Sequence, residues 1–133
     1  MEYKKQRVVT DGVPKEDAEY TNAVKMGPFV FVAGIGGKDA KTGELIKDDL
    51  KKEIEVALTN IKTLVEAAGG TMENVVKTYI IVKNEQVYQE LKKIRQRIYP
   101  QWMKIFPAST AVLGDLIGGA NIEIEAVAII PDE

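Results

Sequence analysis

The sequence contains neither cysteine nor histidine among its 133 residues. Without cysteine, the chain can form no disulfide, no thiolate nucleophile and no thiolate metal site. Without histidine, it lacks the side chain most often used as a general base near neutral pH and the commonest metal ligand. Any catalysis must therefore rest on carboxylates, tyrosine, lysine, arginine, hydroxyl groups, backbone amides or ordered water.

The chain also lacks a strong charge of either sign and any long apolar run. Its 18 basic and 20 acidic side chains give a formal net charge of −2, so the protein as a whole has no electrostatic attraction to nucleic acid or to an anionic membrane. No apolar run approaches the ~20 residues of a membrane span, and the opening "MEYKKQRVV" has no apolar signal region. With 45% hydrophobic and 29% charged residues, the composition predicts a single soluble domain over residues 1–133, located in the cytoplasm.

Hydrophobic periodicity and turn residues predict strands that are interrupted by two helices. The first helix is marked by apolar residues at three- and four-residue spacing and by the stop signal Gly69-Gly70, and the second is expected to end at Pro100. The predicted elements are a strand at 4–10, a hairpin at 21–34 turning at Gly27-Pro28, a helix from about 48 to 69, a strand at 75–83, a helix at 84–100, a strand at 106–113 and a strand at 121–130.

Two helices cannot cover both faces of a sheet of about six strands, so we predict an α+β fold with both helices on one face. In the last strand, alternation places one set of side chains toward the helices: Ile122, Ile124, Ala126, Ala128 and Ile130. The opposite face receives Glu123, Glu125, Val127 and Ile129. An apolar face that also bears carboxylates is poorly suited to water, which predicts burial against other subunits in a closed oligomer. Phe29 and Phe31 are predicted to belong to the core.

Four stretches resemble the Rid family, also called the YjgF or endoribonuclease L-PSP family. They are "TGEL", "NIKTLVEAAGGTMENVVKTYIIVKN", "FPASTAVL" and "IEIEAVAI", and the resemblance runs in order from about residue 20 to 130. It implies a homotrimer with a chorismate-mutase-like α+β fold. Three sheets would then form a central barrel, with the helices outside and the ligand clefts between neighbouring subunits.

The resemblance also implies an activity. Family members hydrolyse reactive enamines and imines, which arise from pyridoxal-phosphate enzymes, to keto acids and ammonia, without a cofactor or metal. Two family site residues match this chain: Tyr20 before the hairpin, and Glu123 in the last strand, where the family's glutamate is thought to orient the attacking water. The resemblance therefore implies Tyr20 and Glu123 as catalytic residues and a small molecule as the ligand.

Several family positions differ here. The arginine of the family's "PARS" motif, which pairs with the substrate carboxylate, is replaced by Ser109. A cysteine two positions later is Ala111, a serine near the end of the third strand is Ala33, and an asparagine on the second helix is Lys92. With Thr110, these are the predicted ligand-binding residues. Losing a guanidinium–carboxylate pair costs about 10- to 10³-fold in binding at ~1.4 kcal/mol per decade, so 2-iminobutanoate is predicted to be a poor substrate.

Other interpretations remain open. From the residues alone, Ser109 and Thr110 are hydroxyls bonded to backbone in a half-buried strand. The basic run Lys92, Lys93, Arg95 and Arg97 is typical of a solvated helix face, but it also favours the RNA cleavage that the family's older name asserts. Ribonuclease chemistry without histidine would need an unusual base, so we expect no nucleic-acid partner. A trimer that only binds a ligand or a partner is a third alternative.

Overall fold

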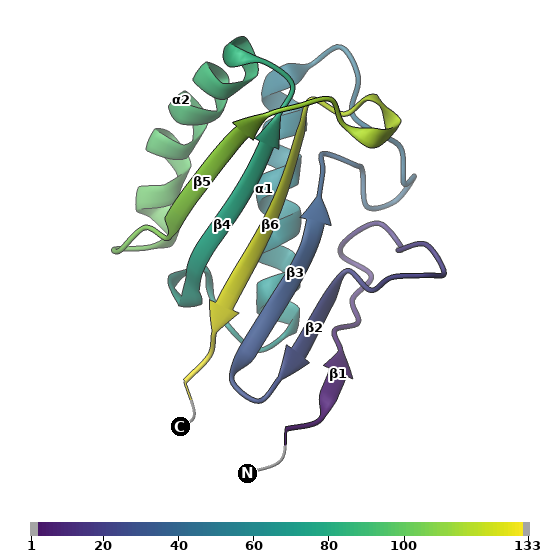
Figure 1. The fold of residues 1–133 in the computed structure, drawn as a ribbon, viewed down its shortest axis with the longest axis vertical. Coiled ribbons are helices and arrows are strands. Elements are labelled where there is room, and N and C mark those ends of the chain that lie inside the picture. The colour runs from purple at the N-terminus through teal and green to yellow at the C-terminus, as the bar shows by residue number, and fades with distance from the viewer. Residues whose placement is uncertain (1–2, 132–133) are drawn as a thin grey trace.

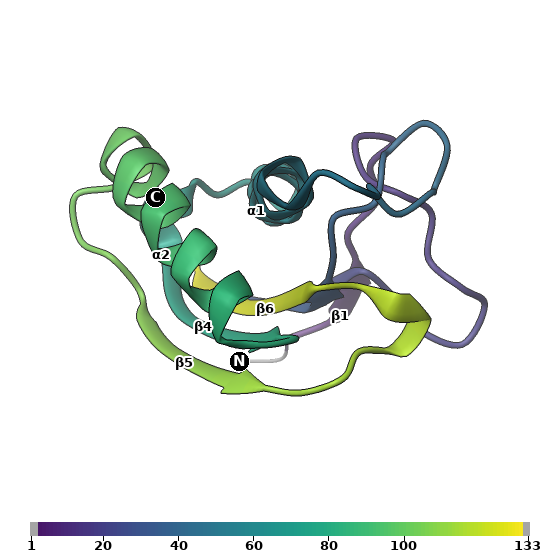
Figure 2. The same cartoon turned by 90° about the horizontal axis from the view of Figure 1, so that it is seen from above.

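One six-stranded sheet carries both helices on a single face, as Figures 1 and 2 show. The computed structural model describes residues 3–131. The strands are β1 (Lys5–Arg7), β2 (Ala23–Met26), β3 (Phe29–Ile35), β4 (Val75–Val82), β5 (Ala108–Leu113) and β6 (Ile122–Ile129). Across the sheet they follow the order β1-β2-β3-β6-β4-β5, and all neighbours are antiparallel except β4 and β5. The predicted α+β class, sheet size and helix placement are confirmed.

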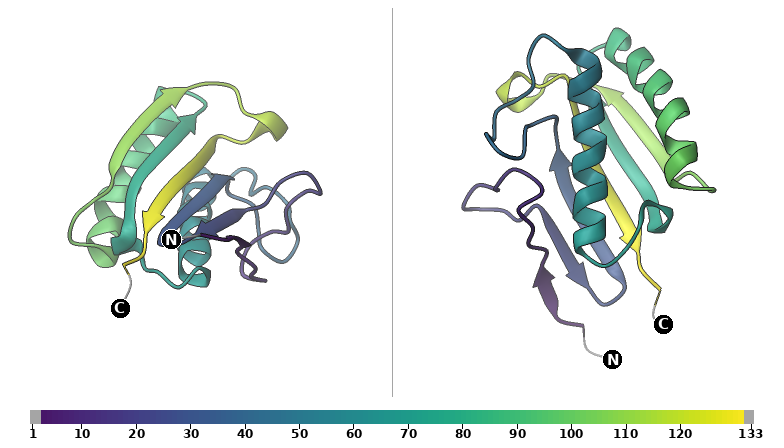
Figure 3. Two further views of the ribbon diagram at one scale, coloured as in Figure 1. Left: turned by 60° about the horizontal axis from the view of Figure 1, so that its bottom comes forward. Right: turned by 180° about the vertical axis from the view of Figure 1, so that it is seen from behind.

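The two long helices begin at side-chain caps. The carboxylate of Asp49 accepts a hydrogen bond from the Lys52 backbone N–H at the start of α1 (Leu50–Ala67). Asn84 accepts one from the Val87 N–H at the start of α2 (Glu85–Trp102). Such caps satisfy backbone donors that have no partner inside the helix. Figure 3 shows α1 crossing the middle of the sheet and α2 lying over the edge formed by β4 and β5.

The prediction that Pro100 ends the second helix is wrong, because α2 continues to Trp102. Proline fits helical φ, and its cost comes from the missing N–H and from its ring. Pro100 is exposed, so the carbonyl it leaves unpaired in the preceding turn can face water. The buried Tyr99 and Met103 hold the last turn against the core, and the Met103 N–H bonds the Tyr99 carbonyl at 2.9 Å.

The strand predicted at 4–10 is shorter in the structure, where β1 contains only Lys5–Arg7. All three residues of β1 are exposed, because β1 is an edge strand with a single neighbour, β2. Two short 3₁₀ segments, Met72–Asn74 and Ile117–Gly119, were not predicted. The hairpin is confirmed: Met26 pairs with Phe29 across the two-residue turn, and Gly27 takes the positive φ of 59° that this turn requires.

The last strand alternates as predicted. Its helix-facing residues Ile122, Ile124, Ala126 and Ala128 are buried in the core, whereas Glu125 and Ile129 of the opposite face are exposed. Within residues 3–131, no helix covers that opposite face, which we call the open face (Figure 2). The expectation that Phe29 and Phe31 belong to the core is wrong in the single chain. They stack on each other with ring centroids 6.5 Å apart and remain 37% and 50% exposed.

Candidate functional site

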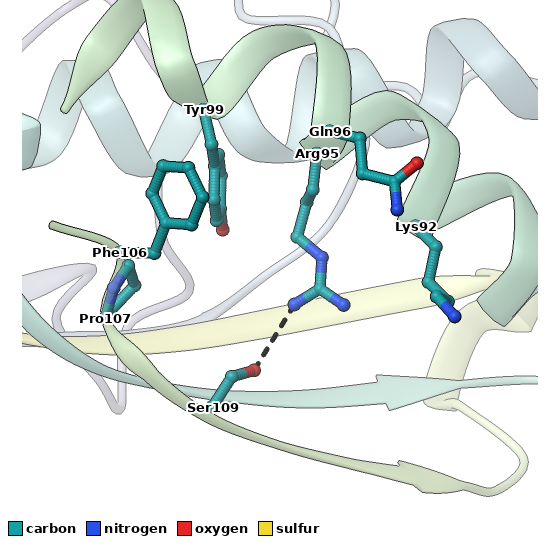
Figure 4. A pocket seen from close by; sticks show the side chains of 7 residues that line it. All are labelled: Lys92, Arg95, Gln96, Tyr99, Phe106, Pro107 and Ser109. Atoms are coloured by element: carbon teal, nitrogen blue, oxygen red, sulfur yellow. Dashed lines mark hydrogen bonds between the residues drawn. The ribbon is translucent and has the colours of Figure 1, made fainter. Parts of the chain in front are cut away.

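A pocket of about 200 Å³ lies between α2 and the start of β5, and we call it the α2–β5 pocket. Figure 4 shows four of its lining side chains extending from the helix, with Phe106, Pro107 and Ser109 on the strand side. The lining residues are Lys92, Arg95, Gln96, Tyr99, Phe106, Pro107 and Ser109. Its walls combine aromatic and proline carbons with one guanidinium, which suits a small ligand that has an apolar part and an anionic group.

Ser109 faces this pocket because of the register of the parallel pair β4–β5. Thr78 pairs with Ser109, and the buried Thr78 hydroxyl donates a hydrogen bond to Ser109 Oγ at 3.1 Å. The neighbouring Thr110 points to the open face, where its Oγ1 accepts a hydrogen bond from Lys77 Nζ at 2.8 Å. Adjacent residues of a strand face opposite sides of a sheet, so these two predicted ligand-binding residues lie on opposite faces.

The Arg95 side chain extends from α2 across the pocket, and its Nη1 donates a hydrogen bond to Ser109 Oγ at 3.3 Å (Figure 4). The other two arginines of the chain have carboxylate partners. Arg97 pairs with Glu55 at 2.7 Å, and Arg7 forms an ion pair with Glu16. Within residues 3–131, no carboxylate lies within ion-pairing distance of Arg95. The basic run therefore does not form one uniform cationic face.

Tyr99 lies one helical turn after Arg95 and is 5% exposed. Its ring packs against Phe106 with centroids 5.9 Å apart. Among the described residues, its buried hydroxyl has no hydrogen-bond partner, although buried polar groups are normally paired. Burial raises the pKa of the Tyr99 hydroxyl above its ordinary value, while the nearby Arg95 charge lowers it. The phenol thus stays a neutral hydrogen-bond donor.

A second pocket, of about 110 Å³, contains both predicted catalytic residues, Tyr20 and Glu123. We call it the Tyr20–Glu123 pocket. Its floor includes Gly34 of β3, and a Cβ atom at that position would lie 2.7 Å from Glu123 Cδ. The glycine therefore makes room for the Glu123 carboxylate. Ala33, the preceding residue, donates its backbone N–H to the Asn22 carbonyl at 2.8 Å, and Asn22 also lines this pocket.

Apart from Thr110, which faces the open side, the structure divides the predicted site residues into two groups. Ser109 and Lys92 line the α2–β5 pocket, and Ala111 shares the helix-facing side of β5 with Ser109 without lining the pocket. Tyr20 and Glu123 lie together at β3 and β6, and Ala33 lies beside them. Strand β4 separates β5 from β6, so the single chain does not unite the groups.

Sequence reasoning missed Arg95 and Tyr99 as lining residues of the α2–β5 pocket. Arg95 follows the buried Leu91 by four residues and Ile94 by one, which places it at the border of the apolar stripe. That spacing was the available signal.

The described residues contain no group of three or more His, Cys, Asp or Glu side chains that could hold a metal ion. Among residues 3–131, no helix is both long and apolar enough to cross a membrane.

The sequence and the fold match known proteins over nearly the whole chain. Residues 11–130 match the model of the endoribonuclease L-PSP family. A RutC family protein of Pyrococcus horikoshii is 34% identical over 125 residues, covering 93% of this chain and 97% of that protein. The human 2-iminobutanoate/2-iminopropanoate deaminase is 33% identical over 124 residues, covering 92% and 88%. The crystal structure of the Escherichia coli YjgF gene product superposes with a TM-score of 0.88 at 28% identity, covering 93% of this chain and 98% of that one.

The similarities to solved structures show that the fold is that of the YjgF-type α+β proteins. The chain belongs to the endoribonuclease L-PSP family, which is also called the Rid family. The predicted resemblance is thereby confirmed, and the deaminase names of several relatives support an imine-deaminase-like function.

Proposed function

We propose that the protein is a homotrimer that hydrolyses a small imine or enamine in clefts between its subunits. Each cleft joins the α2–β5 pocket of one subunit to the Tyr20–Glu123 pocket of the next. The observation that carries this proposal is the division of the predicted site residues into two separate pockets on one chain. A ring of subunits can bring the two pockets together, because a head-to-tail contact places different surfaces of the same chain against each other.

The proposed chemistry needs only a carboxylate and a water molecule. The water oxygen bonds to the imine carbon while Glu123 takes a proton from the water. That proton passes to the nitrogen and gives a carbinolamine. Glu123 then takes the proton of the new hydroxyl group and returns it to the nitrogen as the C–N bond breaks, so the products are a carbonyl compound and ammonia and the carboxylate is regenerated. Tyr20, which lines the same pocket as Glu123, can donate its hydroxyl hydrogen to the nitrogen or to the new oxygen.

Turnover of 2-iminobutanoate is proposed to be slow. Ser109 supplies a hydroxyl at the point of β5 where the resemblance implies a guanidinium, and that hydroxyl already accepts hydrogen bonds from Thr78 and Arg95. A site that binds a ligand without turnover is the alternative outcome.

The test is a coupled assay in which imines are generated in place and ammonia release is measured for the wild type and for Glu123→Gln. We expect release by the wild type on at least one imine, and a loss of about 10²-fold or more in Glu123→Gln, because the amide cannot take the proton. Equal rates in both proteins would exclude Glu123 as the base, and a wild type that only binds would exclude hydrolysis.

Gly34→Ala tests the position of Glu123 without changing its chemistry. The added methyl group would displace the carboxylate, since it would lie 2.7 Å from Cδ and 2.8 Å from Oε2. Gly114→Ala is the matched control, because a Cβ there meets only Ile81 Cγ2, at 3.5 Å. We expect the first variant to lose most of its turnover and the second to retain it, with both folded by circular dichroism. Unchanged turnover in Gly34→Ala would contradict the proposed position of the carboxylate.

A further inference from the structure

Two donor groups in the α2–β5 pocket lack a partner among the described residues: the Arg95 guanidinium has no carboxylate, and the Tyr99 hydroxyl has no hydrogen-bond acceptor. Arg95 donates a hydrogen bond to the neutral hydroxyl of Ser109 at 3.3 Å and lies near the Tyr99 hydroxyl, whereas Arg97, two residues later on the same helix, has its carboxylate partner Glu55 at 2.7 Å. The buried hydroxyl of Tyr99 has no hydrogen-bond partner among the described residues. The buried Tyr99 hydroxyl is the costly member of this pair, and the neighbouring guanidinium has no carboxylate partner, so a ligand that accepts from both would complete the arrangement.

We propose that Arg95 binds the carboxylate of a ligand, with Tyr99 as a second donor, and that this ligand is a monocarboxylate with a compact apolar body. The guanidinium presents two parallel N–H groups that match the two oxygens of a carboxylate. Figure 4 shows Arg95 and Tyr99 both descending from α2 toward β5 on either side of one space. This inference rests on the proposed function and names the substrate class of the same site.

The other lining residues favour a ligand that has an apolar body and a single negative charge. Phe106, Pro107 and the ring of Tyr99 form the end of the pocket that lies opposite Lys92 in Figure 4. Burying hydrocarbon against these rings contributes about 25 cal/mol per Å² of apolar surface. Lys92 also lines the pocket, but at the end away from these rings, so a phosphate held by Arg95 would place a second negative charge beside the apolar walls, which favours the carboxylate.

Anchoring from the helix also fits the slow turnover proposed for 2-iminobutanoate. The Arg95 guanidinium occupies the space directly over Ser109 Oγ. A carboxylate held there lies closer to β5 than one held by the end of a long side chain that extends from β5 itself. The C–N bond of a very short acid is then displaced relative to Glu123, and a longer body is needed to span the cleft.

The experiment is calorimetric titration of the full chain with benzoate, 2-oxobutanoate, benzamide and inorganic phosphate. Arg95→Gln removes the proposed anchor and Tyr99→Phe removes only the hydroxyl. Arg97→Gln is the matched control, since it removes an arginine of the same helix whose partner is Glu55. Arg95→Lys keeps the charge without the paired N–H groups, and thermal unfolding shows that each variant is folded.

We expect the wild type and Arg97→Gln to bind benzoate equally and to bind benzamide and phosphate at least tenfold more weakly. Arg95→Gln should weaken benzoate binding by about 10- to 100-fold, Tyr99→Phe by about 2- to 10-fold, and Arg95→Lys by an intermediate factor. The proposal is overturned if the wild type binds no carboxylate, if Arg95→Gln binds like Arg97→Gln, or if benzamide or phosphate binds as tightly as benzoate.

The two proposals fail separately. Carboxylate binding that depends on Arg95, without ammonia release from any imine, would support the proposed role of Arg95 and contradict the proposed hydrolase activity. Ammonia release that needs Glu123 but is unchanged in Arg95→Gln would support the proposed hydrolase activity and contradict the proposed role of Arg95.

Discussion

The carboxylate of Glu53 in α1 accepts two hydrogen bonds from Asn121, the residue that precedes β6. The Asn121 backbone N–H bonds Oε2 at 2.8 Å, and its Nδ2 bonds Oε1 at 2.7 Å. Glu53 is 2% exposed, so both bonds form away from water. Since Glu123 follows Asn121 by two residues, this contact ties the first turn of α1 to the start of the strand that carries the proposed catalytic carboxylate.

Removing this contact should destabilise the fold. Glu53→Ala leaves the Asn121 donors unpaired in a buried environment, which costs about 2–4 kcal/mol of unfolding free energy. Glu55→Ala, two residues away on the same helix, loses only the surface ion pair with Arg97 and should cost less than about 1 kcal/mol. Urea denaturation of both variants measures the difference. Equal stabilities would mean that the buried contact contributes no more than the surface pair.

Placing an arginine at position 109 tests whether the ligand carboxylate is bound by a residue of α2 or by a residue of β5. In Ser109→Arg, the new guanidinium meets that of Arg95, whose Nη1 already lies 3.3 Å from Ser109 Oγ. Two like charges about 4 Å apart repel by roughly 1–4 kcal/mol, depending on the local dielectric. We therefore expect the single variant to gain little hydrolysis of 2-iminobutanoate, and Ser109→Arg combined with Arg95→Gln to gain more.

Thr110→Arg is the control for this substitution, because Thr110 faces the opposite side of β5 and contacts Lys77. Once sedimentation shows that this variant keeps the mass of the wild type, it should change neither 2-iminobutanoate turnover nor 2-oxobutanoate binding in the α2–β5 pocket. A single Ser109→Arg variant that equals the double variant would show that Arg95 does not occupy the anchoring position. Rapid hydrolysis of 2-iminobutanoate by the wild type would show that this reaction does not need a guanidinium on β5.

The open face of the sheet predicts the oligomeric state. Sedimentation of the wild type should give a mass near three times 14.7 kDa at micromolar concentration. Phe31→Glu adds a charge at an aromatic residue that is 50% exposed on this face, and it should shift the mass toward that of a monomer. Thr59→Glu, an exposed residue of α1, adds the same charge on the helical side and should leave the mass unchanged. A monodisperse wild-type monomer would contradict the proposed inter-subunit cleft.

The segment that leads from α2 into β5 is fastened by Glu73. Its Oε1 accepts the Lys104 backbone N–H at 2.7 Å, and its Oε2 accepts the Ile105 N–H at 3.2 Å. These hydrogen bonds hold the pKa of Glu73 below its ordinary value of 4.5. Because the pKa is lower in the folded protein than in the unfolded chain, the stability that Glu73 contributes is present above pH 4.5. It is lost as the pH falls through the lower folded value.

Glu73→Gln should therefore reduce the loss of stability that acidification causes. Comparing urea denaturation at about pH 6 and about pH 3 measures this loss. Glu66→Gln, whose exposed carboxylate pairs with Lys62, should behave more like the wild type. If Glu73→Gln and the wild type lose the same stability between the two pH values, the Lys104 and Ile105 contacts do not stabilise the folded protein.

Local patterns in the sequence determined most of the fold. Asp49 and Asn84 mark helix starts because their side chains satisfy donors within three residues of them. The two faces of β6 follow from alternation, since one side of a central strand must be apolar. The family resemblance and the residues Tyr20 and Glu123 were also available from the sequence, and the structure places these two in one pocket.

Tertiary structure alone decided the composition of the α2–β5 pocket. Strand β5 is an edge strand that remains largely exposed on both faces in the single chain, so its sequence carries no alternation to tell Ser109 from Thr110. Only pairing with Thr78 turns Ser109 toward the helix. Arg95 and Arg97 are chemically identical and differ only in the partner that the packing of α2 presents to each of them. Sequence spacing sets the angle of a side chain on its helix, but the neighbouring element decides whether a guanidinium meets a carboxylate or an open pocket.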